Sequence, residues 1–205
     1  MLNLVLIPAL LLSAEPKWEK AADTDGVVVM RRDKDGTPIK EVRATGVFEA
    51  SPDRVWEIIR DLDNYQRFMP YTAEVKVLER TAGDKEVLCY QRLNAPVVSE
   101  RDYIILLKDQ TSEKDGKTLY KVSWNAAAKE KDALMPEKKD VVRVRINDGY
   151  WQLEGNSDNT RTLATYYVYT SPGGSVPTFV INIANTEAVP KVFASIRKEL
   201  KKRAK

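Results

Sequence analysis

Two residue types that carry much of protein chemistry are almost missing from this sequence. The chain of 205 residues has no histidine and one cysteine, Cys89. Without histidine it can form neither a Ser-His-Asp or Cys-His nucleophile system nor an imidazole metal site. A lone cysteine can form neither an internal disulfide nor a thiolate zinc site. We expect no metal, no cofactor and no catalytic residues, and without histidine any acid or base would have to be Glu, Asp, Tyr or Lys.

Charge is unevenly spread along the chain. The formal net charge is +3, but residues 191–205 hold seven basic residues and one acid, so this segment carries +6 and the remainder −3. The segment is either a solvated helix end or a surface for transient contact with an anionic membrane. The rest of the chain has no basic stripe interleaved with aromatic residues, and we expect no nucleic-acid binding.

The composition is that of one soluble globular domain, since hydrophobic residues make up 43% and charged residues 31%. We expect a monomer.

Residues 1–14 are uncharged, mostly apolar and too short to span a bilayer. They predict a signal peptide with a cleavage site at Ser13-Ala14, a mature domain over 15–205, and export to the periplasm or the medium. The alternatives are a misplaced start or an N-terminal hydrophobic strand, with the protein in the cytoplasm.

Hydrophobic spacing and turn residues predict strands, one early helix and one long final helix. Ser51-Pro52 starts the early helix, and Gly46 suggests a bulge or a close approach inside a strand. We expect a short helix over 18–22, a long strand interrupted near Asp148-Gly149, and a final helix of about 28 residues, or roughly 42 Å. The strands are expected at 27–30, 39–48, 74–79, 86–93, 101–108, 118–125, 141–153 and 160–170.

The order of these elements predicts an α+β fold. Consecutive strands with short turns form an antiparallel meander, and the final helix carries an apolar stripe that includes Phe179 and Ile183. A large sheet and a single long helix bury their apolar faces only if the curved sheet wraps around the helix. A curved sheet and a helix cannot touch everywhere, so we expect an apolar hollow between them.

Four stretches of the sequence, in this order, resemble the StAR-related lipid-transfer (START) family. They are Val55-Trp56 followed by Met69-Pro70-Tyr71, then Arg101-Asp102-Tyr103, then Met135-Pro136-Glu137-Lys138, and finally the run from Pro172 to Pro177. The similarity covers roughly residues 18–203. It implies the helix-grip fold of that family, with a tunnel that holds one lipid or sterol and admits it by movement of loops and of the C-terminal helix.

The resemblance also places individual residues. It puts Tyr103, Ile105 and Leu107 on the inner face of their strand. Sterol-binding members carry an acid and an arginine inside the tunnel, but Leu107 stands at the position of the arginine, and the acid's position falls near Cys89 to Gln91. Sterol, phospholipid, fatty acyl chain and quinone therefore all remain open as ligands. A ligand hydroxyl could meet Gln91, Tyr103 or Tyr167.

We hypothesise a non-enzymatic carrier of one hydrophobic ligand. Strand alternation and the helix stripe predict that Tyr103, Ile105, Leu107, Trp124, Phe179 and Ile183 line a closed apolar tunnel. Arg101 and Asp102 are more simply read as a structural ion pair or turn contact than as a ligand site. The alternatives are a cyclase-like or hydrolase-like enzyme on the same fold, which needs a tuned acid or base, and a module that docks a protein.

Overall fold

The computed structural model describes residues 17–96, 98–114, 116–174 and 176–204, without the side chains of residues 114, 179 and 183–185. The helices in this part are α1 (Pro52–Arg60), α2 (Tyr65–Phe68) and α3 (Thr178–Arg203), with 3₁₀ turns η1 (Leu62–Asn64), η2 (Ala82–Asp84) and η3 (Lys129–Leu134). The strands are β1 (Glu19–Thr24), β2 (Val27–Lys34), β3 (Thr37–Phe48), β4 (Thr72–Arg80), β5 (Glu86–Leu93), β6 (Arg101–Asp109), β7 (Ser112–Lys114), β8 (Lys117–Ala126), β9 (Val142–Arg143), β10 (Ile146–Gly155) and β11 (Thr162–Ser171).

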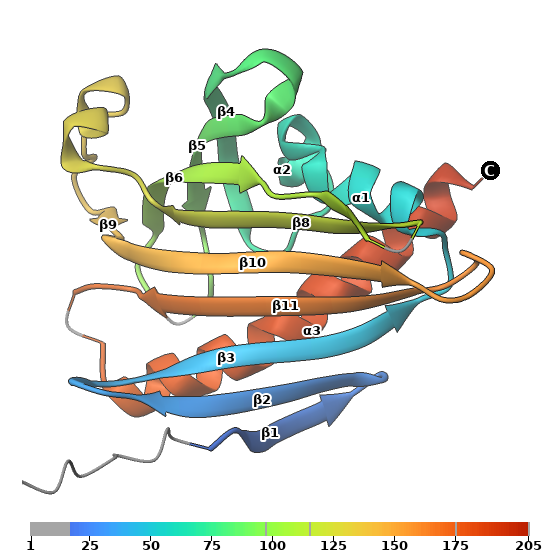
Figure 1. The fold of residues 1–205 in the computed structure, drawn as a ribbon. Helices are drawn as coiled ribbons and strands as arrows, with labels where there is room; N and C mark the ends of the chain where they lie inside the picture. The colour runs from blue at the N-terminus through green and yellow to red at the C-terminus, as the bar shows by residue number, and fades with distance from the viewer. Residues whose placement is uncertain (1–16, 97, 115, 175, 205) are drawn as a thin grey trace, which may run out of the picture.

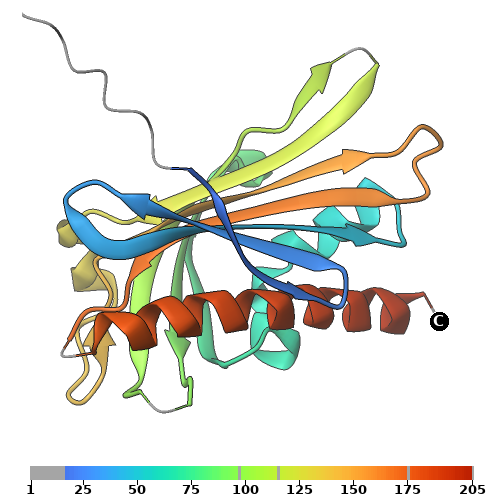
Figure 2. The same ribbon diagram turned by 90° about the horizontal axis from the view of Figure 1, so that it is seen from below.

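These strands form one curved sheet, with the α+β helix-grip architecture expected from the sequence. The described strands run in the order β1-β2-β3-β11-β10-β8-β6-β5-β4, with β7 beside β8 and β9 beside β6. Neighbours are antiparallel except β6 and the short β9. α3 crosses the concave face of the sheet and runs through Pro190 as one helix (Figures 1 and 2). None of the described helices is both long enough and apolar enough to cross a membrane.

Two local expectations are wrong. The segment expected as a helix over 18–22 is the edge strand β1, because so short a helix is unstable alone while its backbone can pair with β2. The interruption expected near Asp148-Gly149 falls earlier, between β9 and β10, and Gly149 lies inside a continuous strand.

The core lies between the sheet and the C-terminal half of α3. The Phe193 ring of α3 is fully buried, stacks on Phe48 at 5.4 Å between ring centroids, and lies 5.2 Å from Trp151. The close approach expected at Gly46 is present, since a Cβ atom there would lie 2.9 Å from Cε1 of Phe193. Glycine at this position lets the helix sit directly on the sheet.

Gly46→Ala should therefore destabilise the protein by about 1–3 kcal/mol, because Phe193 is enclosed by two other rings and cannot retreat from the added methyl group. Urea denaturation measures this free energy. Adding Phe193→Leu makes room for the methyl group, so the double variant should lose less than the sum of the two single losses. Strict additivity of the two losses would contradict the proposed clash.

Candidate ligand cavity

A cavity of about 240 Å³ lies between the sheet and α3. Its sheet wall consists of inward side chains from β5, β6, β8, β10 and β11, because alternate residues of a strand face the same side. Ala188, Val189 and Val192 of α3 lie opposite. The remaining wall comes from the stretch between Ile59 of α1 and Thr72 of β4, including Leu62, Tyr65, Met69, Pro70 and Tyr71.

Aromatic side chains shape the sheet wall. Trp124 of β8 is paired in register with Leu107 of β6 and with Gly149 of β10. The Trp124 indole occupies the space that a side chain at position 149 would fill, so Gly149 lets the ring lie flat against the sheet. Tyr166 lies beside Trp151 and Trp124, at 4.6 and 5.7 Å between ring centroids.

The polar groups of the wall form a hydrogen-bonded chain without charge. Trp124 donates from Nε1 to Oδ1 of Asn147 at 3.2 Å, and the Asn147 side chain hydrogen-bonds to the Tyr103 hydroxyl. Tyr103 donates to Oε1 of Gln91 at 2.9 Å. The nearest partner of the Gln91 amide nitrogen is the Cys89 sulfur at 3.9 Å. This chain runs along the wall from β10 to β5.

The described residues that line the cavity carry no charged side chain. Burial raises the pKa of the Tyr65, Tyr103 and Tyr166 hydroxyls far above their usual range, so these groups stay protonated at neutral pH. The described residues also contain no cluster of three or more His, Cys, Asp or Glu side chains placed to hold a metal ion.

Tyr71 joins three elements where the cavity wall meets the surface. It adopts a φ of 61° between α2 and β4, and its carbonyl accepts a hydrogen bond of 2.8 Å from the Asn94 amide after β5. The exposed Lys191 of α3 donates to its hydroxyl at 2.5 Å, and the Lys191 nitrogen lies 5.2 Å from the centre of its ring. Lys191 thus links α3 to the segment between α2 and β4 beside the cavity.

The structure brings five of the eight expected ligand-binding residues together in the cavity wall: Gln91, Tyr103, Ile105, Leu107 and Trp124. Tyr167 lies on the opposite, outer face, where its hydroxyl donates to Glu41 at 2.5 Å and its ring lies 6.5 Å from Trp18. Its neighbour Tyr166 faces the cavity instead. The side chains of Phe179 and Ile183 lie outside the described residues.

Several lining residues were missed in the sequence. Asn147 is in phase with the inward positions of β10, but the interruption expected near Asp148 concealed that phase. Tyr65 and Met69 lie in an irregular segment with no periodicity to assign a face. Tyr166 and Tyr167 are adjacent, and only the register of β11 against β10 decides which of the two points inward.

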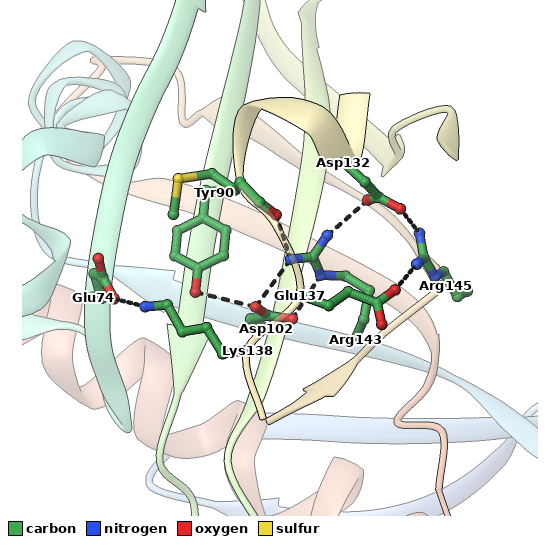
Figure 3. A network of polar contacts seen from close by, with 9 residues as sticks. Glu74, Tyr90, Asp102, Asp132, Glu137, Lys138, Arg143 and Arg145 are labelled. Atoms are coloured by element: carbon green, nitrogen blue, oxygen red, sulfur yellow. Dashed lines mark hydrogen bonds and ion pairs between the residues drawn. The ribbon is translucent and has the colours of Figure 1, made fainter. Parts of the chain in front are cut away.

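The Arg101-Asp102 motif does not reach the cavity. Asp102 points to the outer face, where its carboxylate accepts hydrogen bonds from Arg143 at 2.7 and 3.1 Å and from Tyr90 at 3.1 Å (Figure 3). Arg143 also donates to Asp132 at 2.7 Å and to the Met135 carbonyl at 2.8 Å. This network holds the segment from η3 to β9 against the outside of the sheet.

The rim of this network is also charged. Lys138 donates to Glu74 at 2.9 Å, and this hydrogen bond, with those from Lys76 and Arg92, lowers the pKa of Glu74 to about 2 (Figure 3). Beneath the segment, Leu88, Tyr90 and Ile104 form a second, smaller hydrophobic core with Met135 against it. Strands β5 and β6 are therefore buried on both faces, which explains the unbroken apolar run from Tyr103 to Leu107.

Comparisons with known proteins agree with this geometry. Residues 48–197 match the family described as polyketide cyclase / dehydrase and lipid transport. The phosphatidylcholine transfer protein of Rattus norvegicus is 26% identical over 184 residues, which are 88% of this chain and 82% of that protein.

Solved structures show the same fold. A STAR-related lipid transfer protein (fragment 25–204) of Xanthomonas axonopodis is 28% identical, with a TM-score of 0.77 over 90% of this chain and 98% of that one. Human StAR-related lipid transfer protein 5 shares the fold at 17% identity, with a TM-score of 0.80 over 92% of this chain and 88% of that one.

Proposed function

The chain belongs to the polyketide cyclase / dehydrase and lipid transport family, and from this premise we propose that it binds one hydrophobic molecule in the cavity under α3 and transfers it between membranes. The main support for this proposal is the cavity itself. It is mostly apolar, its described lining is uncharged, and a single helix covers it. Burial of an apolar ligand gains roughly 25 cal/mol per Å², so binding requires no catalytic group. The lipid transfer proteins among its relatives support the same function.

The family description also includes cyclases, and the cavity favours binding over such chemistry. Cyclisation or hydrolysis needs an acid or base that changes protonation near neutral pH. The described lining offers only tyrosine hydroxyls as ionisable groups, and burial raises the pKa of Tyr65, Tyr103 and Tyr166 away from that range. We therefore propose that the protein is not an enzyme.

Native mass spectrometry of protein purified from its own host tests the proposal. We expect the mass of a monomer plus one hydrophobic molecule, which solvent extraction then releases for identification. Protein purified with no bound molecule, and unable to take up lipid from vesicles, would contradict a carrier function. The same spectrum reports the oligomeric state, for which we propose a monomer.

We propose that the basic end of α3 makes transient contact with anionic membranes. Lys198 and Lys201 are exposed and have no ion-pair partner among the described residues, whereas Arg203 is held by Glu199 and Asp61. Lys198→Gln with Lys201→Gln should weaken binding to vesicles containing phosphatidylserine by about 2 kcal/mol at low salt, since each basic residue near the surface contributes about 1 kcal/mol. Vesicle co-sedimentation measures this loss.

The matched control removes the same charge elsewhere. Lys117 and Lys129 are also exposed, on β8 and η3, and replacing both by glutamine should leave vesicle binding nearly unchanged. The difference between the two variants should disappear as salt screens the charges. An equal loss in both variants would mean that net charge, and not the end of α3, determines binding.

We propose further that residues 1–14 direct export and are removed. N-terminal sequencing of the protein recovered from its host should begin at Glu15. Recovery of the intact N-terminus from the cytoplasm would instead support the alternative in which this segment is no signal.

A further inference from the structure

Along the hydrogen-bonded chain in the cavity wall, each donor points the same way, from Trp124 toward Gln91. The Trp124 end fixes this direction, because an indole N–H can only donate. The oxygen of the Asn147 amide must therefore be the atom that accepts from Trp124. The amide nitrogen of Asn147 then faces the Tyr103 oxygen, and the Tyr103 proton is directed to Oε1 of Gln91. The chain of donors therefore ends at the amide nitrogen of Gln91.

The amide nitrogen of Gln91 remains without a strong acceptor. Gln91 is 7% exposed, and the one contact of this nitrogen is the weak acceptor Cys89 Sγ at 3.9 Å. A buried donor that lacks a partner is costly, and Gln91 lines the cavity. The hydroxyl of Tyr166 also has no hydrogen-bond partner among the described residues. The amide oxygens of Asn147 and Gln91 each accept a hydrogen bond already, whereas the amide nitrogen of Gln91 has no strong acceptor, so the unmet need of the wall is for a ligand acceptor.

No charged side chain accompanies these donors. The described lining is neutral, and a buried carboxylate or phosphate would lose its hydration there without gaining a counter-ion. Lys191, which contacts Tyr71 at the rim, is already engaged by the hydroxyl and ring of that residue, and the buried Arg101 is not among the lining residues. The volume of about 240 Å³ lies below the range of roughly 300–1,000 Å³ common for ligand pockets, which favours a single chain over two.

We infer that the cavity selects a single-chain hydrophobic molecule whose polar group is an uncharged hydrogen-bond acceptor, an ester or ketone carbonyl, placed against the amide nitrogen of Gln91. This inference rests on the proposed binding function and narrows its ligand class. It places an acyl ester or a carbonyl-bearing lipid in the cavity and excludes a charged head group from it. The phosphocholine group of the lipid named for one relative is thus not expected inside this cavity.

Three probes of equal chain length separate these possibilities. Methyl oleate carries an ester, oleate a carboxylate at pH 8, and 9-octadecene no polar group. Displacement of a bound fluorescent reporter from the full chain measures each dissociation constant. We expect methyl oleate to bind at least tenfold more tightly than oleate and at least fivefold more tightly than 9-octadecene.

Two variants test whether Gln91 and Tyr103 in the cavity wall cause the preference for methyl oleate. Gln91→Leu should remove most of the advantage of methyl oleate over 9-octadecene, while the affinity for 9-octadecene stays within about twofold. Because Gln91→Leu leaves the Tyr103 hydroxyl without its acceptor, the double variant with Tyr103→Phe removes that donor as well and should abolish the advantage completely. Circular dichroism confirms that each variant is folded before binding is compared.

Several outcomes would overturn the inference. Oleate that binds as tightly as methyl oleate, with a tenfold loss in Lys191→Gln, would place a charged head group at the rim. Equal binding of all three probes would remove the selectivity while leaving the proposed carrier function intact. If none of the probes binds, 9-octadecene included, the carrier function itself fails and this inference fails with it.

Discussion

Leu107→Trp should abolish ligand binding and leave the fold standing. Leu107 is 8% exposed, lines the cavity, and lies between Val87 of β5 and Trp124 of β8 in the sheet. A tryptophan there extends into the space of about 240 Å³ that the ligand needs. We expect the affinity of any cavity ligand to fall at least tenfold, which corresponds to about 1.4 kcal/mol. The free energy of unfolding of the ligand-free protein should change by less than about 1 kcal/mol.

The contrast with an ordinary core position makes this result informative. In a tightly packed core the same substitution costs about 1–3 kcal/mol from overpacking. Leu106→Trp is the matched control, because Leu106 is the next residue of β6 and faces outward against the small core of Leu88, Tyr90 and Ile104. This control should bind ligand normally. A Leu107→Trp protein that still binds ligand and loses stability would mean that the position is simply core.

The sequence predicts the cavity wall best where the local sequence pattern indicates which residues of a strand share a face. Tyr103, Ile105 and Leu107 alternate along one strand, and a period of two residues places all three on one face. A glycine inside a strand indicates a bulge or a close approach by another group, and at Gly46 the close approach is the one present. Alternation shows only that the three residues share a face, and the resemblance to the START family predicts that this face is the inner one. The structure places the three side chains in the cavity wall and Gly46 against Phe193.

Expectations fail where the answer depends on pairing between distant segments. Tyr166 and Tyr167 are equally suited to the wall, and the register of β11 between β3 and β10 turns the first inward and the second outward. Residues 19–24 form a strand because β2 offers an edge to pair with, which no local propensity indicates. The hydrogen-bonded chain from Trp124 to Gln91 joins four strands, β8, β10, β6 and β5, and has no sequence signature.

The Arg101-Asp102 motif is the clearest example, because its partner is distant. Arg143 follows Asp102 by 41 residues, and the two meet only because β9 pairs in parallel with β6. Adjacent opposite charges suggest a local contact, yet Arg101 donates to the Ser99 carbonyl and the buried carboxylate of Asp102 belongs to Arg143. Neighbours in sequence on one strand point to opposite faces, so they are poorly placed to pair.

Breaking this pair should give the largest loss of stability. The side chains of Arg143 and Asp102 are 3% and 1% exposed, and Arg143→Met leaves the carboxylate buried with the Tyr90 hydroxyl as its remaining donor. Burial lowers the pKa of Arg143, but the hydrogen bonds and the attraction of Asp102 and Asp132 together outweigh this effect and raise the pKa, so the buried guanidinium stays charged. Urea denaturation should show a loss of about 3–5 kcal/mol.

Two further variants distinguish a buried charge from lost packing. Arg145→Met makes the same change two residues away, at a side chain that is 43% exposed, and should cost no more than about 1 kcal/mol. Adding Asp102→Leu to Arg143→Met removes the orphaned charge and should recover part of the stability. A loss in Arg143→Met no greater than that in Arg145→Met would mean that the pair contributes nothing. Because the network lies on the outer face, the folded fraction of each variant should bind cavity ligands with unchanged affinity.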